Sequence, residues 1–251
     1  MCLIVFAWRP DHAQPLVVAA NRDEFHARPS LPLGCWEDAP WIIGGRDLQA
    51  GGTWMGVTAR GRFAALTNIR APGQAIGPRS RGELPEQYLR GNLPPADYLA
   101  ELAERRGDYA GFNLLVGDRQ TLWYLNSHDG QPQALQAGVY GLSNAGLDTP
   151  WPKLRKARAA LADVLDQPEP ERLLALLADA EPAAEHELPQ TGVPLEWERR
   201  LSSVFIASAE YGTRASTALI RHADGSLDIV ERSFGPDGPL NEVRYRQPPR
   251  D

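Results

Sequence analysis

The residue best suited to covalent chemistry is Cys2, which directly follows the initiator Met1. A small second residue allows removal of Met1, which would leave a thiol and a free α-amine on one residue. A free α-amine has a pKa of about 7.7–8.0, so part of it is unprotonated at neutral pH and could take the proton of its own thiol. This is the arrangement of an N-terminal nucleophile. Position alone leaves open a second reading, in which Cys2 is a small apolar residue that opens a buried strand.

A run of four polar residues, Asn21 to Glu24, follows the apolar run Leu16 to Ala20. If this apolar run pairs with the first strand as a hairpin, the polar side chains lie beside Cys2. Asp23 could then hold the α-amine by a charge-assisted hydrogen bond. The planar guanidinium of Arg22 could orient a thiolate or a substrate carboxylate. The alternative is a polar turn capped by Asn and Asp.

Two asparagines, Asn68 and Asn144, are each expected at the end of a strand. A side-chain amide can donate a hydrogen bond to a developing oxyanion, as acyl transfer requires. Asn is also a common strand terminator, so this role depends on Cys2 and Asp23 lying nearby. Trp54, in a Gly-rich segment, could line a pocket, although packing in the core is the ordinary role of a tryptophan.

The composition excludes several other kinds of site. A formal net charge of −6 argues against nucleic acid as a general partner. The two cysteines are too few for a disulfide scaffold or a four-thiolate zinc site. Cys35, between Gly34 and Trp36, is expected to pack in the interior. The five histidines are scattered, so no metal site is predicted. Lys153 and Lys156 are the only lysines, which leaves few candidates for Schiff-base chemistry.

The elements that must position these residues follow from the apolar runs. Cys2 to Trp8 and Leu16 to Ala20 predict a hairpin buried on both faces. Further strands are predicted before, between and after two groups of helical segments, which are 84–90 with 95–106 and 151–165 with 171–177. Of these, 151–165 has the clearest amphipathic spacing. Glu181 to Glu198 is expected to be a long surface loop. Runs of strands beside runs of helices favour a layered α+β fold, and a sandwich of two antiparallel sheets covered by helices fits. One domain over residues 1–251 is predicted.

No signal peptide and no membrane span is predicted, because no apolar run approaches about 18 residues. The simplest location is cytoplasmic. Nothing in the sequence predicts the oligomeric state.

The chain resembles the NRDE family, the group that contains the eukaryotic transport and Golgi organisation protein 2 and its bacterial relatives. The resemblance covers nearly the whole chain, in order. The segments that carry it are MCLIVF at the start, NRDEF at 21–25, RPS at 28–30, GGRD at 44–47, GGTWMG at 51–56, ALTN at 65–68, LSN at 142–144, LDTPWPK at 147–153 and YGTR at 211–214. The family is in turn similar to N-terminal nucleophile hydrolases of the choloylglycine hydrolase and penicillin V acylase type.

This resemblance implies a four-layer αββα fold and a set of roles. Cys2 matches the nucleophile, and Asp23, in an Asn-x-Asp that begins at Asn21, matches the partner of the α-amine. Asn68 and Asn144 lie where the oxyanion and substrate asparagines would fall. Arg214 corresponds loosely to a later arginine. The hydrolases place an Arg immediately before their Asn-x-Asp, whereas this chain has Ala20 there and Arg22 inside the motif.

Two functions are therefore predicted as alternatives. The first is a cysteine amidohydrolase that acts on a non-peptide amide and requires no cofactor, with Asn21, Arg22, Trp54 and Arg214 contacting the substrate. The second is a non-catalytic carrier of haem or lipid on a hydrolase-like fold. It is motivated by the displaced arginine and by the family's links to haem trafficking and lipid homeostasis. In both, the partner is a small molecule.

Overall fold

The computed structural model describes residues 2–73 and 77–249. The chain divides into two compact units. The six-stranded unit comprises residues 1–27, 70–72 and 137–251, and the seven-stranded unit comprises residues 28–69 and 73–136. Each unit contains one antiparallel sheet and the helices that cover it. The predicted single domain stays a prediction.

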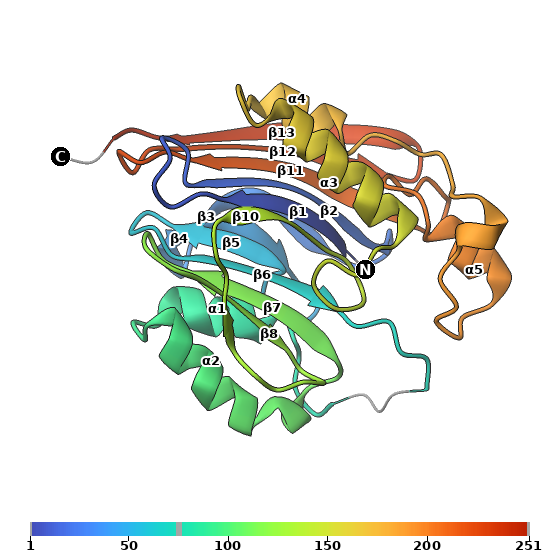
Figure 1. The fold of residues 1–251 in the computed structure, drawn as a ribbon, viewed down its shortest axis with the longest axis horizontal. Helices are drawn as coiled ribbons and strands as arrows, with labels where there is room; N and C mark the ends of the chain where they lie inside the picture. Colours follow the sequence, from blue (N-terminus) through green and yellow to red (C-terminus); the bar gives the residue numbers. More distant parts are fainter. Residues whose placement is uncertain (1, 74–76, 250–251) are drawn as a thin grey trace. The chain divides into compact units, whose positions relative to one another are not determined.

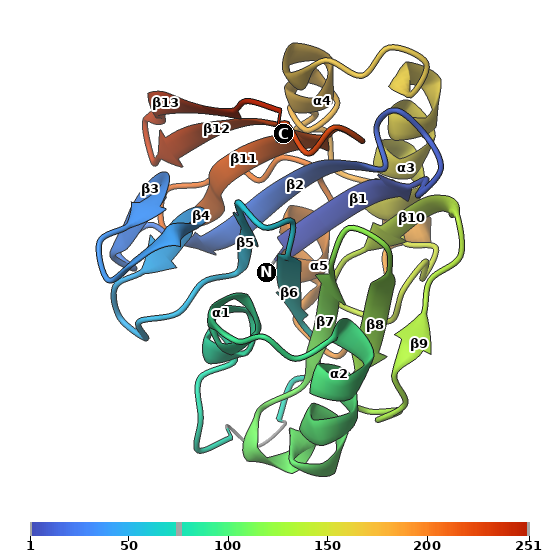
Figure 2. The same ribbon diagram turned by 90° about the vertical axis from the view of Figure 1, so that its left-hand side faces the viewer.

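The sheet of the six-stranded unit has the strand order β10-β1-β2-β11-β12-β13, which can be followed in Figure 2. Its strands are β1 (Cys2–Trp8), β2 (Leu16–Phe25), β10 (Gly138–Leu142), β11 (Tyr211–Arg221), β12 (Leu227–Gly235) and β13 (Gly238–Gln247). Its helices are α3 (Pro152–Val164), α4 (Pro170–Ala175), the 3₁₀ turn η2 (Glu185–Glu187) and α5 (Leu195–Arg200).

The hairpin of β1 and β2 forms the centre of this unit, as the apolar runs predict. Every residue from Cys2 to Trp8 is buried. Leu3, Val5 and Ala7 pack with apolar residues of α3 and α4 on one face. In Figure 1, both helices lie on the same side of the sheet. Cys2 has the opposite parity, so its side chain points to the other face.

The seven-stranded unit has the order β3-β4-β5-β6-β7-β8-β9. Its strands are β3 (Ser30–Trp36), β4 (Ala39–Asp47), β5 (Met55–Thr58), β6 (Phe63–Asn68), β7 (Phe112–Gly117), β8 (Leu122–Asn126) and β9 (Gln133–Ala134). The helices α1 (Glu83–Arg90) and α2 (Pro95–Glu104) pack over this sheet, and the 3₁₀ turn η1 (Arg106–Asp108) follows them. Tyr88 and Tyr98 are buried in this core.

The predicted fold class is confirmed: the protein is α+β, with two antiparallel sheets that each carry helices on one face, the layers of an αββα sandwich. Three local predictions need correction. Strand β2 continues to Phe25, so Asn21 to Glu24 lie within a strand and form no turn. The predicted surface loop 181–198 contains η2 and most of α5. Cys35, expected to pack, is exposed. No helix of the described residues is long and apolar enough to cross a membrane.

Candidate active site around Cys2

Cys2 is the first residue of β1 and is 7% exposed. In the antiparallel ladder it stands directly opposite Arg22 of β2. Opposite residues of a ladder place their side chains on the same face. Arg22 therefore shares a face with the thiol, although it occupies a different motif position from the arginine of the hydrolases. Met1, whose removal would free the Cys2 amine, lies outside the described residues.

Asp23 is buried at 1% exposure and lies next to Arg22 on β2, on the opposite face of the strand. Its Oδ1 accepts a hydrogen bond of 2.8 Å from the Thr213 hydroxyl of β11. Burial raises the pKa of Asp23, while the charges of Lys153 and Arg70 and the Thr213 hydrogen bond act in the opposite direction. The carboxyl group is thus fixed in place beside the end of the strand that carries Cys2.

Asn21 holds three segments of the chain together. Its Nδ2 donates to the carbonyl oxygens of Leu177 at 3.0 Å and Val204 at 2.8 Å. Its Oδ1 accepts a 2.6 Å hydrogen bond from the Ser216 hydroxyl. These bonds give Asn21 a structural role at the base of the site. The substrate contact expected of it stays a prediction.

Asn144 follows β10, which pairs with β1 through Leu142 opposite Ile4. Ser143, between Leu142 and Asn144, donates a hydrogen bond from its hydroxyl to the Cys2 carbonyl oxygen at 3.1 Å. Asn144 is 1% exposed, and its own carbonyl accepts a 2.7 Å bond from the Arg70 backbone N–H. The structure therefore brings Cys2, Asp23 and Asn144 to one end of the same sheet.

Arg214 occupies an irregularity in β11, where the pairing with β2 shifts between Thr213 and Ala215. A bulge of this kind redirects the side chain of the extra residue. The guanidinium donates to the carbonyl oxygens of Phe25 at 2.9 Å and His26 at 3.1 Å. Partial burial lowers the pKa of Arg214, and the nearby charge of Arg22 adds to this effect. Arg214 is thus near Arg22, and its guanidinium is held against the backbone at the end of β2.

The remaining predicted residues belong to the seven-stranded unit. Asn68 is half-buried and ends β6, opposite Phe112 of β7. Trp54 is half-buried directly before β5, and its carbonyl accepts a 2.7 Å bond from the Leu66 N–H. Their predicted roles at the site stay predictions.

An ion pair that the sequence does not predict supports this end of the sheet. Arg70 Nη1 and Glu198 Oε2 are 2.8 Å apart, and both side chains are about 95% buried. The other carboxylate oxygen of Glu198 accepts bonds from the backbone and the hydroxyl of Thr191, at 2.8 and 2.6 Å. The Arg70 guanidinium also lies over the ring of Trp151, 4.7 Å from its centroid. The two residues are 128 positions apart in the sequence, so no local sequence pattern predicts the pair.

Lys153 is a second buried charge that the sequence analysis did not predict near the site. It lies in the first turn of α3 and is 3% exposed. Its pKa is lowered to about 8, chiefly by burial; the charge of Arg70 contributes to the lowering, while Asp23 and Cys2 oppose it. One signal was present in the sequence: a cation in the first turn opposes the helix dipole, so a lysine there needs a compensating partner.

Burial also raises the pKa of the Cys2 thiol; the charges of Asp23 and Glu24 add to the rise, and Arg22 opposes it. Because the thiolate is the reactive species, Cys2 is expected to be alkylated slowly at neutral pH. At pH 7.5 we expect iodoacetamide to modify Cys2 in a C35A variant about tenfold or more slowly than exposed Cys35 in a C2A variant. The Cys2 rate should still be rising above pH 9. A Cys2 profile that levels off below pH 8 would show instead a thiolate stabilised at rest.

Fold and site together define an α+β protein whose cysteine opens a buried strand, flanked by an arginine and an aspartate of the neighbouring strand. The chain belongs to the Transport and Golgi organisation 2 family, whose model matches residues 1–236. It is 34% identical over 257 residues to the Transport and Golgi organization 2 homolog of Mus musculus, with 93% of each chain covered. The Homo sapiens homolog is 33% identical over the same coverage.

Two solved structures show a weaker similarity. A C2A mutant of conjugated bile acid hydrolase from Clostridium perfringens matches with a TM-score of 0.45 at 8% identity, covering 99% of this chain and 97% of that one. A Caenorhabditis elegans ortholog of N-acylethanolamine-hydrolyzing acid amidase matches with a TM-score of 0.42 at 11% identity, covering 87% and 92%.

Proposed function

We propose that the chain is a cysteine amidohydrolase of the N-terminal nucleophile kind, acting on a non-peptide amide. The observation that carries this proposal is the position of Cys2. Its thiol opens a buried strand and faces the same side as Arg22, while the aspartate next to Arg22 is buried and fixed by Thr213. A cysteine that served only to pack would need neither charged neighbour, and burying both is costly unless they are used.

The reaction follows from the chemistry of these groups. Once Met1 is removed, the α-amine of Cys2 takes the thiol proton as Sγ attacks the amide carbon and the C–S bond forms. The carbonyl electrons move to oxygen, and the tetrahedral oxyanion needs donors such as the Asn144 amide. The amine then leaves with the proton that the α-amine had taken, giving a thioester. Water attacks the thioester, which releases the acid and returns the proton to Cys2.

The raised pKa of the thiol fits this scheme. A thiol that stays protonated at rest loses its proton only when a base takes it during attack, so it is protected from unwanted oxidation. Asp23 would hold the protonated α-amine during the reaction, and Arg22 and Arg214 would orient an acidic part of the substrate.

The first test is the intact mass of the protein purified from its native host, followed by turnover of a panel of amides. We expect a mass lacking one Met and hydrolysis of at least one amide. A variant with one arginine inserted between Met1 and Cys2, which blocks Met removal, should lose turnover while it keeps its fold by circular dichroism. Retained Met1 in an active native protein would refute the α-amine as the base.

The carrier alternative predicts a different set of results. It requires a saturable change in the Soret band on titration with haem, or saturable lipid binding, without turnover of any amide in the panel. Cys2 could serve there as a thiolate ligand, so loss of binding in C2A would not distinguish the two functions. Amide turnover does.

A further inference from the structure

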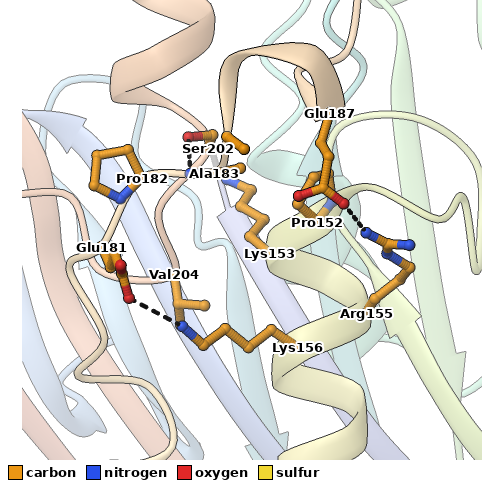
Figure 3. A pocket seen from close by; sticks show the side chains of 11 residues that line it. Pro152, Lys153, Arg155, Lys156, Glu181, Pro182, Ala183, Glu187, Ser202 and Val204 are labelled. Atoms are coloured by element: carbon orange, nitrogen blue, oxygen red, sulfur yellow. Dashed lines mark hydrogen bonds and ion pairs between the residues drawn. The ribbon is translucent and has the colours of Figure 1, made fainter.

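The strongest unexplained feature lies at the start of α3, within the six-stranded unit. A pocket of about 520 Å³ opens there, large enough for a small metabolite. We call it the α3 pocket. It is lined by α3, by the segment 181–187 and by the end of the segment that precedes β11 (Figure 3). Both lysines of the chain line it.

Of the three cations that line the α3 pocket, Arg155 and Lys156 form ion pairs with carboxylates. Arg155 pairs with Glu187 at 2.7 Å. Lys156 pairs with Asp179, and its Nζ is 3.9 Å from Glu181. These cations are more than half exposed, and Figure 3 draws Glu187 beside Arg155 and Glu181 beside Lys156. The carboxylates of the pocket are therefore already matched by the exposed cations.

Lys153 differs from both. Its side chain is buried, and its Nζ has no hydrogen-bond partner among residues 2–73 and 77–249. In Figure 3 its side chain extends from α3 between the side that carries Glu181 and the side that carries Glu187. Burying an ammonium group without a hydrogen-bond partner costs free energy. The cost is removed when an anion enters the pocket and accepts its hydrogen bonds.

The N-terminus of α3 also favours binding of an anion. The helix has no side-chain cap, and Pro152 has no N–H, so the N–H groups of Lys153 and Leu154 have no acceptor within the helix. The positive end of the helix dipole adds to the charge of Lys153 at this point. Helix N–H groups and a lysine together are the donors that bind carboxylate and phosphate groups in other proteins.

We propose that the α3 pocket binds a small molecule through an oxyanion group, a carboxylate or a phosphate, with the Lys153 ammonium as its anchor. The charged and titratable groups close enough to affect the pKa of Lys153 are Asp23 of β2, Arg70 of the segment 70–72 and Cys2 of β1. The residues that line the α3 pocket, Lys153 included, have no role in the proposed catalytic chemistry. It can therefore be tested whether or not Cys2 hydrolyses an amide.

The presence of only two lysines makes a direct test practical. In protein labelled with ¹³C at lysine Cε, the K156R variant retains a single lysine signal, that of Lys153. Sodium phosphate and sodium acetate are titrated in separate series at constant ionic strength against sodium chloride. We expect a saturable shift of this signal with phosphate, acetate or both, and a rise of its titration midpoint from about 8. A shift no larger than that with chloride would overturn the proposal.

Two matched variants separate a built site from general attraction by positive charge. K153M and K156M each remove one lysine from the same pocket, and calorimetry measures binding of the tighter probe. Loss of a charge-assisted hydrogen bond should weaken binding about tenfold to hundredfold in K153M. K156M should bind within about threefold of the unchanged chain, since Lys156 is exposed and paired. Equal loss in both variants would refute Lys153 as the anchor. If K153M does not fold, the Lys153 signal of K156R still decides.

Discussion

Replacing Cys2 by alanine is expected to lower kcat by about 10⁴-fold or more on any amide that the chain hydrolyses. Loss of a nucleophile removes the covalent route, and what remains is the contribution of binding and oxyanion stabilisation. On a free-energy scale, a 10⁴-fold loss is about 5 kcal/mol of transition-state stabilisation. The measurement is single-turnover kinetics with the substrate found in the amide panel.

The structure supplies a matched control for this substitution. Cys35 is the other cysteine, and it is exposed, so C35A makes the same chemical change outside the site. C35A should retain full turnover and full stability. C2A leaves a small residue at position 2, so Met1 removal and the α-amine are preserved. C2S keeps a weaker nucleophile and should retain less than about one hundredth of the activity. Full turnover in C2A would end the hydrolase proposal.

The part of the fold that sequence could predict is the part that depends on local apolar pattern. The runs of β1 and β2 are continuous and of strand length, and the helix over residues 152–164 has a regular apolar stripe. The predicted end of β2 was wrong for a physical reason. Asn and Asp favour turns by themselves, but here Asn21 bonds with Ser216 and Asp23 with Thr213, so β11 draws them into the sheet.

In the candidate site, too, residues marked by a local sequence pattern could be predicted, and residues placed by distant contacts could not. Cys2 and Asn144 could be singled out from the sequence because one begins a recognisable strand and the other follows one, and Asp23 because it comes soon after the apolar run of β2. Arg214 could be matched only loosely, since its direction is set by an irregularity in β11. The pair of Arg70 and Glu198 could not be found at all, because opposite charges far apart in the sequence carry no signal of contact.

This buried pair gives the prediction with the largest effect on stability. Arg70→Met leaves Glu198 in a site where it is 4% exposed, with the two bonds from Thr191 as its remaining side-chain hydrogen bonds within residues 2–73 and 77–249. Removing one member of a buried ion pair typically costs about 3–5 kcal/mol, because the other charge stays buried without compensation. We expect a loss of this size in urea unfolding, seen as a lower midpoint with an unchanged slope.

Two comparisons show whether the cost arises from the orphaned charge. The double variant R70M/E198M, which removes both charges, should recover most of the stability, since apolar replacements of a buried pair are often neutral. R155M breaks the exposed pair with Glu187 and should cost less than about 1 kcal/mol. The backbone N–H of residue 70 bonds to the Asn144 carbonyl, so a backbone shift after loss of the ion pair would also displace Asn144, and we expect R70M to lower turnover as well. A double variant as unstable as R70M would assign the cost to lost packing of Arg70 on Trp151 instead.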